Sequence, residues 1–218
     1  MNEQELQQIA AQLRQPHGED GLKTAEWMNK GNLNIHRNAL SILNAKAGDN
    51  ILEIGMGNGF HVKSILSIHP NIQYTGCDFS ELMVEESKKL NADWISRGKA
   101  NFIFSDATSL PFANNSFNKI FTINTIYFWE DKIAVLSEIK RVLQPKGELI
   151  IAFRPKHFTE KYPFIKYGFN QFSLDDVVKL LSENGFEIVK KIENPEPDVE
   201  MNGEIMKMEN VIVIGKKE

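Results

Sequence analysis

Three glycines stand at alternate positions behind a short apolar run in the stretch ILEIGMGNGF, residues 51–60. They are Gly55, Gly57 and Gly59. Glycine lets the backbone turn tightly and approach a ligand without a Cβ in the way. A dinucleotide site needs the spacing G-x-G-x-x-G. Neither register completes it, because the sixth position is Phe60 counted from Gly55 and Val62 counted from Gly57.

The acid in the same run, Glu53, bears on the kind of ligand. It precedes the first glycine by two residues. A carboxylate that pointed into the site would repel a pyrophosphate, whereas it would attract a ligand with a cationic head. The loop by itself leaves two interpretations open: a site for such a ligand, or a strand-ending turn with no ligand at all.

Two aspartates close the next two predicted strands. Asp78 ends YTGCD, 78 − 59 = 19 residues beyond the last glycine, and Asp106 follows FIFS. An acid at the end of the second strand can accept from both ribose hydroxyls, in NAD and in other adenosine ligands alike. Asp106 could accept from an adenine amino group. Each aspartate alone could instead cap a helix or turn, as could Ser80, but acids or glycines at three successive strand ends favour an adenosine ligand.

Composition limits the class of protein. The 218 residues carry 25 Lys plus Arg against 29 Asp plus Glu, a net charge of −4, which disfavours a nucleic-acid partner. The only cysteine, Cys77, can form neither an internal disulfide nor a zinc cluster, so we expect no metal site and a reducing cytosol. The N-terminus lacks signal-peptide features, and no apolar run reaches membrane-spanning length. The sequence therefore predicts a cytoplasmic protein without a membrane span.

Short apolar runs alternate with helical patterns over residues 49–153. Strands are predicted over NILEIG, NIQYTGC, NFIFS, NKIFTIN and GELIIAF. Helices are predicted over HVKSILSIH, SELMVEESKKLNADWISRG and KIAVLSEIKRVLQ. Apolar strands separated by helices indicate a parallel sheet that is covered on both faces. Ligands bind such sheets outside the carboxyl ends of the strands, where the glycine loop and both aspartates lie.

The C-terminal part has a different pattern. Ser173 and Asp176 resemble a capping box for the helix LDDVVKLLSEN, and Gly185 ends it. FEIVKKI, followed by the turn-rich ENPEPD, and ENVIVIG predict an antiparallel strand pair. We expect one α/β domain over 1–218. Its parts would be N-terminal helices covering the ligand site over 1–46, a binding core over 49–153, a candidate substrate lid over 154–172, and a C-terminal helix and strand pair over 173–218.

Four ordered motifs, ILEIGMGNG, GCDFS, DATSLPF and RVLQPKGELII, resemble those of class I S-adenosylmethionine-dependent methyltransferases. The resemblance spans about residues 49–153 and is to the small-molecule group (methyltransferase type 11) related to quinone biosynthesis. It implies a Rossmann-like, doubly wound fold with helices on both faces of a seven-stranded sheet. The implied strand order is 3-2-1-4-5-7-6, with the last strand antiparallel, a role that ENVIVIG fits.

The resemblance also implies a cofactor, S-adenosylmethionine, and the residues that hold it. These are Glu53, Gly55, Gly57 and Gly59 for the methionine part, Asp78 for the ribose, Phe79 beside the adenine, Asp106 and Ala107 for the adenine edge, and Asn124 for the amino-acid end. A sulfonium ligand without phosphates accounts for both the acid and the missing dinucleotide spacing. Asn118 and Lys146 depart from the family's common residues at positions that do not usually contact the cofactor.

The implied reaction passes a methyl group to a small-molecule acceptor and leaves S-adenosylhomocysteine. Because positive sulfur already activates the methyl group, the protein needs mainly to align the acceptor and exclude water. A general base is required only if the acceptor arrives protonated, and the catalytic residue stays unassigned at this point. His61 and His157 are candidate bases. For either residue the alternative, a solvent-exposed histidine with no catalytic role, is the commoner case.

The segment NTIYFWE follows the fourth strand and is expected to face the transferred methyl group. Asn124 and Tyr127 have the spacing of the N-P-P-Y motif of amino-group methyltransferases, but both prolines are replaced, which disfavours amine methylation. Tyr127 and Trp129 are predicted pocket walls, and Phe128 is expected to pack at the base of a helix; the alternative is that all three aromatics pack there. The six aromatics and four Lys or Arg of residues 154–172 suggest an aromatic or anionic substrate, or equally a surface connection whose aromatics pack on the sheet.

Two other classes of function stay open. A non-catalytic protein that binds S-adenosylmethionine and regulates a partner would share the same site. A nicotinamide-dependent oxidoreductase is disfavoured by the glycine spacing. The sequence leaves the acceptor, the atom methylated and the oligomeric state undetermined.

Overall fold

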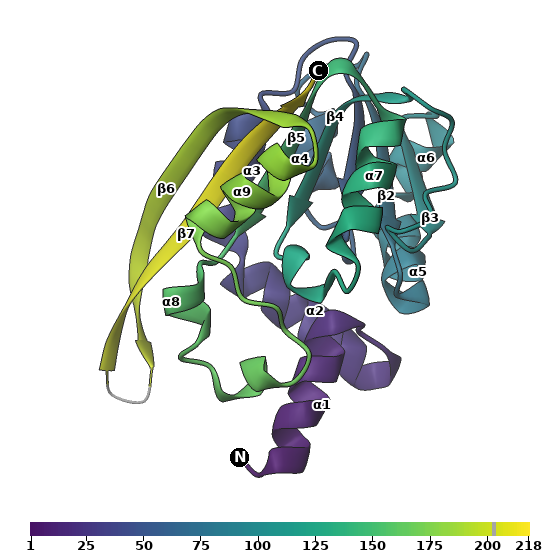
Figure 1. The fold of residues 1–218 in the computed structure, drawn as a ribbon. Helices are drawn as coiled ribbons and strands as arrows, with labels where there is room; N and C mark the ends of the chain where they lie inside the picture. Colours follow the sequence, from purple (N-terminus) through teal and green to yellow (C-terminus); the bar gives the residue numbers. More distant parts are fainter. Residues whose placement is uncertain (202–203) are drawn as a thin grey trace.

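The centre of the molecule is a seven-stranded sheet with the order β3-β2-β1-β4-β5-β7-β6 (Figure 1). The computed structural model describes residues 1–201 and 204–218. The strands are β1 Asn50–Ile54, β2 Gln73–Asp78, β3 Ala100–Phe104, β4 Phe117–Ile123, β5 Leu143–Phe153, β6 Phe186–Met201 and β7 Glu204–Lys217. The first five strands run parallel, and β7 is antiparallel to both of its neighbours. The order and the antiparallel last strand confirm the fold that the resemblance implied.

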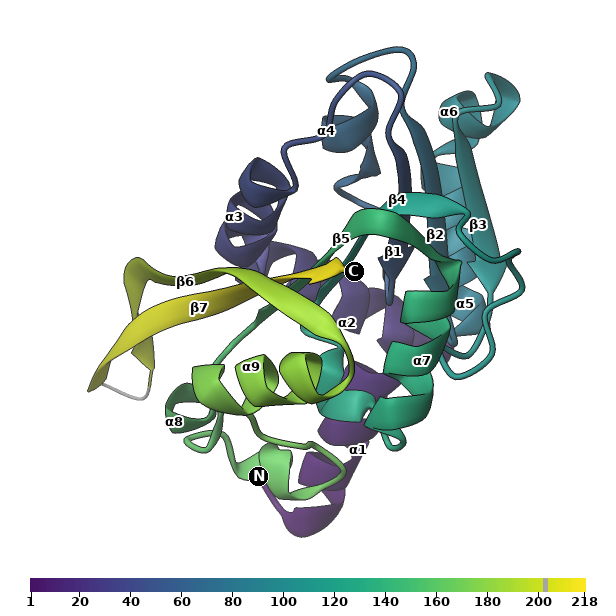
Figure 2. The same cartoon turned by 45° about the horizontal axis from the view of Figure 1, so that its top comes forward.

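Helices cover both faces of this sheet (Figure 2). They are α1 Glu3–Arg14, α2 Gly18–Gly31, α3 Leu33–Leu43, α4 Val62–Leu66, α5 Glu81–Leu90, α6 Ala92–Ser96, α7 Lys132–Val142, α8 Lys156–Thr159 and α9 Leu174–Glu183, with short 3₁₀ turns η1 Ile126–Phe128 and η2 Pro163–Lys166. Helices α7 and α9 bury their apolar residues in one core cluster, whereas α3 and α4 bury theirs in the other. Neighbouring strand residues Ile51 and Leu52 point to opposite faces, and both are fully buried.

The helix predicted over residues 80–98 is interrupted at Asn91. The Asn91 side chain donates to the carbonyl oxygens of Gly59, at 3.1 Å, and Ser87, at 3.0 Å. An asparagine that bonds to nearby backbone in this way competes with helix continuation. The break therefore connects the end of α5 to the back of the glycine loop, a contact that helical periodicity does not reveal.

The strands predicted over residues 186–192 and 209–215 form the expected antiparallel pair, but the turn predicted at ENPEPD is wrong. Residues 193–198 continue β6, and the hairpin projects beyond the rest of the sheet (Figure 1). Strand β6 lies at the sheet edge, where Pro195 and Pro197 are tolerated because an edge residue can leave its nitrogen unpaired. A register shift between Glu196 and Val199 absorbs the irregularity.

Across the part of the chain that the structure describes, no helix combines the length and the apolar character needed to cross a bilayer.

Candidate functional site

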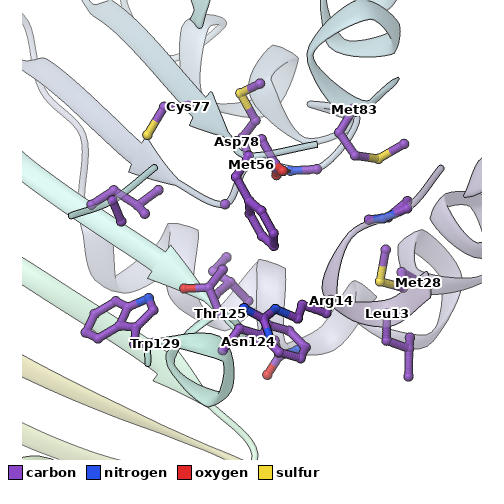
Figure 3. A pocket seen from close by; sticks show the side chains of 18 of the residues that line it. Leu13, Arg14, Met28, Met56, Cys77, Asp78, Met83, Asn124, Thr125 and Trp129 are labelled. Atoms are coloured by element: carbon purple, nitrogen blue, oxygen red, sulfur yellow. The ribbon is translucent and has the colours of Figure 1, made fainter. Parts of the chain in front are cut away.

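A cavity of about 390 Å³ opens at the carboxyl ends of the parallel strands. Side chains and backbone that follow four strands line it, including Gly55 after β1, Asp78 at the end of β2, Asp106 after β3 and Asn124 after β4. The N-terminal helices form the opposite wall: Figure 3 shows Leu13, Arg14 and Met28 facing the side chains of the strand ends. The cavity is therefore assembled from strand ends far apart in the sequence and is covered by α1 and α2.

The three glycines of the loop differ in what surrounds them, although all have positive φ. A Cβ on Gly55 would lie 2.2 Å from the Thr125 methyl carbon, so this glycine lets the β1 and β4 loops approach. Gly57 lines the cavity, has open space where its Cβ would be, and donates its N–H to Asp78 Oδ2 at 3.0 Å. Gly59 faces α5 behind the loop. Only Gly55 and Gly57 of the three are cavity residues.

Asp78 is buried and held by backbone donors. Its Oδ1 accepts from the Ser80 N–H at 2.9 Å, and its Oδ2 accepts from the N–H of Gly57. Burial raises the pKa of Asp78 from 3.8 to about 6, although these N–H groups favour the ionised form. Ser80, not Asp78, is the N-cap of α5, because its hydroxyl accepts from the Met83 N–H. Asp78 therefore carries a buried carboxylate into the cavity without a capping role.

Phe79, Asp106 and Ala107 line the same cavity. The Phe79 carbonyl accepts from the Gln15 side chain at 2.8 Å, which attaches the end of α1 to the β2 loop. Asp106 Oδ1 accepts from both the N–H and the hydroxyl of Thr108 at 2.8 Å. Asp106 thus caps its own turn, which is the alternative role that the sequence left open. It also lines the cavity.

Glu53 lies behind the cavity wall, not in it. Its side chain is 1% exposed, and its Oε2 accepts from the Tyr74 hydroxyl at 2.5 Å and bonds to Nε2 of His61 at 2.7 Å. His61 is the residue that lines the cavity, and it is buried, contrary to the expected exposed histidine. The Glu53 carboxylate therefore contacts the His61 imidazole, and the imidazole rather than the carboxylate faces the cavity.

The segment after β4 differs from its prediction. Tyr127 is a buried residue outside the cavity wall: its hydroxyl accepts from the Arg154 N–H at 2.5 Å and donates toward Asn124 Oδ1 at 3.0 Å. Phe128, expected inside, lines the cavity together with Trp129. The reason is the 3₁₀ turn η1, which directs consecutive side chains to different sides.

The segment over residues 154–172 also lies outside the cavity wall. Its Phe169 packs against Phe128 with ring centroids 4.7 Å apart, and its Tyr167 hydroxyl donates to Glu3 of α1 at 2.9 Å. His157 pairs with Glu209, on β7. The segment thus supports two walls of the cavity from behind. Near the N-terminus Met28 lines the cavity, whereas Trp27 is 62% exposed.

Several cavity residues have no signal in the sequence motifs. Arg14 and Glu130 both line the cavity and form an ion pair at 2.5 Å between α1 and the loop after η1. His36 and Asn32, from the α2–α3 region, line it too, and Asn32 Oδ1 accepts from the Asn124 side chain at 3.2 Å. These partners lie 92 or more residues apart in the sequence, so no local spacing reveals them.

Within residues 1–201 and 204–218, no three His, Cys, Asp or Glu side chains are grouped as a metal site would require. The cavity instead offers one buried carboxylate, amide groups, backbone N–H groups and aromatic faces.

The middle of the chain matches a known family. Residues 52–151 match the family model described as a methyltransferase domain. An O-methyltransferase of Pyrenophora dematioidea is 37% identical over 123 residues, covering 55% of this chain and 46% of that protein. The ubiquinone/menaquinone biosynthesis C-methyltransferase UbiE of Desulfotalea psychrophila is 34% identical over 134 residues, covering 57% and 51%. The chain therefore spans about half the length of these curated relatives.

Solved structures share the whole fold. The partner of the Haloferax volcanii Trm112 methyltransferase activator in a solved complex has a TM-score of 0.77 at 17% identity, with 97% of each chain covered. A SAM dependent methyltransferase from Aquifex aeolicus has a TM-score of 0.64 at 20% identity, covering 83% of this chain and 88% of that chain. Motifs, strand order and sequence relatives agree: residues 52–151 belong to the methyltransferase domain family, and the fold is similar to that of class I S-adenosylmethionine-dependent methyltransferases.

Proposed function

We propose that this protein transfers a methyl group from S-adenosylmethionine to a small-molecule acceptor. The observation that carries the proposal is Asp78, a buried carboxylate held between the glycine loop and α5 and facing a cavity at the strand ends. In this position it would accept from the two ribose hydroxyls. The ring of Phe79 and the turn at Asp106 and Ala107 would hold the adenine, and Asn124 would lie at the amino-acid end.

The cavity fits such a ligand. Its volume of about 390 Å³ lies within the range of small-molecule sites, roughly 300–1,000 Å³. When bound, the sulfonium group supplies an activated methyl. The protein's own contribution is to orient an acceptor against the strand ends, and the walls from α1, α2 and η1 keep water out. A small-molecule acceptor is supported by the relatives named O-methyltransferase and ubiquinone/menaquinone biosynthesis C-methyltransferase.

We also propose that the chain folds as one domain and works in the cytoplasm. One core cluster contains both Ile35 of α3 and Ile212 of β7, so the two ends of the chain contribute to the same core. The single cysteine, Cys77, is a buried free thiol, and a chain without a cysteine pair suits a reducing compartment.

Calorimetric titration with S-adenosylmethionine, S-adenosylhomocysteine and NAD tests the function. We expect micromolar binding of both sulfur ligands and none of NAD. Release of S-adenosylhomocysteine on addition of acceptors would then separate an enzyme from a non-catalytic binding protein. Failure of both sulfur ligands to bind at millimolar concentration would contradict the proposal, and tight NAD binding would revive the oxidoreductase alternative.

Replacing Gly57 with alanine is expected to weaken S-adenosylhomocysteine binding about tenfold or more, because the new methyl group would occupy space on the cavity wall. The φ of +58° adds a stability cost of about 1–2 kcal/mol. Gly98→Ala is the matched control, since Gly98 also has positive φ and open space but ends α6 away from the cavity. Calorimetry and thermal melting measure both effects. Equal binding by the two variants would contradict the placement of the ligand.

A further inference from the structure

Four titratable side chains from separate elements meet beside the cavity. Glu53 comes from β1, Tyr74 from β2, His61 from the loop before α4, and His36 from α3. Glu53 and Tyr74 are 1% exposed, and the two imidazole rings stack with centroids 4.5 Å apart. Both histidines line the cavity, whereas Glu53 lies behind them. The proposed cofactor contacts do not use this group.

The hydrogen bonds define which nitrogen of His61 carries the proton. Burial and the nearby Glu53 raise the pKa of Tyr74 well above 10, so its hydroxyl stays protonated and donates to Glu53 Oε2. The same oxygen then accepts from His61 Nε2 at 2.7 Å. A neutral His61 therefore has its proton on Nε2 and a free electron pair on Nδ1.

Nδ1 of His61 is open to the cavity. Among the described residues it has no hydrogen-bond partner, and none of their fully buried side-chain nitrogens or oxygens lacks one. Nδ1 is therefore accessible, and His61 is a cavity-lining residue. A carboxylate, an imidazole and an open nitrogen facing a ligand site form the arrangement of a general base with its orienting acid.

His36 adds no positive charge to the stacked pair of imidazoles. Burial, and to a lesser extent the charge of His61, lower the pKa of His36 to about 3. His36 is therefore neutral at physiological pH and adds no charge beside His61. The Phe121 ring meets the His61 ring in a T-shaped arrangement, with centroids 6.3 Å apart.

We propose that His61 is the general base of this enzyme and that its acceptor is a weakly acidic hydroxyl on a small aromatic or enolic molecule. The proposal rests on the proposed methyl transfer. The hydroxyl proton passes to Nδ1 of His61 while the freed electron pair, on oxygen or on a conjugated carbon, bonds to the methyl carbon. The carbon–sulfur pair stays on sulfur, which leaves a neutral thioether, and Glu53 stabilises the imidazolium until its proton passes to water.

The walls of the cavity favour this class of acceptor. Phe128 and Trp129 present aromatic side chains, while Tyr127, the counterpart of the N-P-P-Y tyrosine, is held away by Asn124 and Arg154. A neutral amine needs no base to attack, whereas a phenol with a pKa of about 10 is almost entirely protonated at pH 7. A general base in the cavity therefore assists methylation of a hydroxyl group but is not needed for methylation of an amine.

The first test requires no acceptor. NMR of the ligand-free protein with isotope-labelled histidine, assigned by His61→Gln, is expected to show the proton of His61 on Nε2. Glu53→Gln should loosen that preference, and Tyr74→Phe should preserve it. A His61 that carries its proton on Nδ1 overturns the proposal whatever the activity.

The second test measures transfer of labelled methyl groups from saturating S-adenosylmethionine to small phenols, catechols and their matched anilines across pH. We expect transfer to the hydroxyl compounds only, with turnover falling as the pH is lowered. His61→Gln should reduce kcat about 100-fold or more. Glu53→Gln, a positioning variant, should lower kcat less and shift the pH profile. Half-buried His69→Gln, outside the cavity wall, is the control and should match wild type.

Calorimetry separates a base from a cofactor contact. For His61→Gln, S-adenosylhomocysteine affinity is expected to stay within about threefold, which is under 1 kcal/mol. Weaker binding with unchanged kcat would show that His61 holds the cofactor and would overturn the proposal. Transfer to anilines, or to none of the hydroxyl compounds while the cofactor binds, would overturn it too. Absence of all cofactor binding would instead refute the proposed function.

Discussion

Replacing Asp78 with asparagine is expected to weaken S-adenosylhomocysteine binding about 100-fold, measured by calorimetry at pH 7.5. Two hydrogen bonds from ribose hydroxyls to a carboxylate contribute about 1.5–3 kcal/mol each, and each 1.4 kcal/mol is about tenfold in affinity. An asparagine presents one acceptor oxygen and turns an N–H₂ group toward the second hydroxyl. Burial raises the pKa of Asp78, so the free protein gains from losing this charge, whereas the N–H of Gly57 or Ser80 loses its acceptor. Because these two effects oppose each other, the Tm should change by only a few degrees.

The same carboxylate predicts how binding depends on pH. The pKa of Asp78 in the ligand-free protein is about 6, and only the ionised form accepts from both hydroxyls. Affinity for S-adenosylhomocysteine should therefore be nearly constant above pH 7 and fall about tenfold for each unit below pH 6. The affinity falls at low pH because protonation of Asp78 competes with ligand binding. In Asp78→Asn this dependence should disappear.

Asp131→Asn is the matched control for both measurements. Asp131 also lines the cavity, but its carboxylate accepts from the Ala134 N–H as the N-cap of α7, a task that asparagine performs equally well. Its affinity should stay within about threefold of wild type. If Asp78→Asn binds as tightly as this control, the assignment of the ribose site is wrong.

Replacing Arg154 with methionine is expected to lower the free energy of unfolding by about 3–5 kcal/mol, the cost of leaving one partner of a buried ion pair alone. The guanidinium of Arg154 contacts both carboxylate oxygens of Glu196, at 3.1 and 3.2 Å, and their side chains are 9% and 3% exposed. It also donates to the carbonyl oxygens of Glu209 and Gly31. The pair therefore connects the projecting hairpin to β5 and to the end of α2, and thermal melting should show a loss of about 10 °C.

The double variant Arg154→Met/Glu196→Met identifies the cause. Removing both charges should recover part of the lost stability, because the penalty comes mainly from an uncompensated buried carboxylate. Recovery is incomplete, since Asn210 loses its bond to Glu196 at 2.6 Å. Lys179→Met, in the exposed pair with Glu183, should cost less than about 1 kcal/mol. A double variant less stable than Arg154→Met would show that the carboxylate is satisfied without the guanidinium.

The sequence by itself determined the parallel strands of the sheet and the edge of the sheet at which the site lies. The apolar runs and the turn residues between them locate the five parallel strands, and the carboxyl ends of parallel strands share one edge of the sheet. For that reason the glycine loop, Asp78 and Asp106 could be expected around one ligand without any knowledge of the fold. Whether Asp78 or Ser80 capped α5 could not be decided, because both side chains can reach a helix N-terminus from these positions.

Tertiary structure alone decided which side chains face the ligand. Tyr127 turns inward because Arg154, 27 residues away, donates to its hydroxyl, and Phe128 takes its place in the wall. Glu53 stands behind His61 because Tyr74 of the neighbouring strand shares its carboxylate. The wall formed by α1 depends on contacts such as Arg14 with Glu130, 116 residues apart. Local patterns set backbone direction and burial, whereas the orientation of a polar side chain depends on partners that only the folded chain brings within hydrogen-bonding distance.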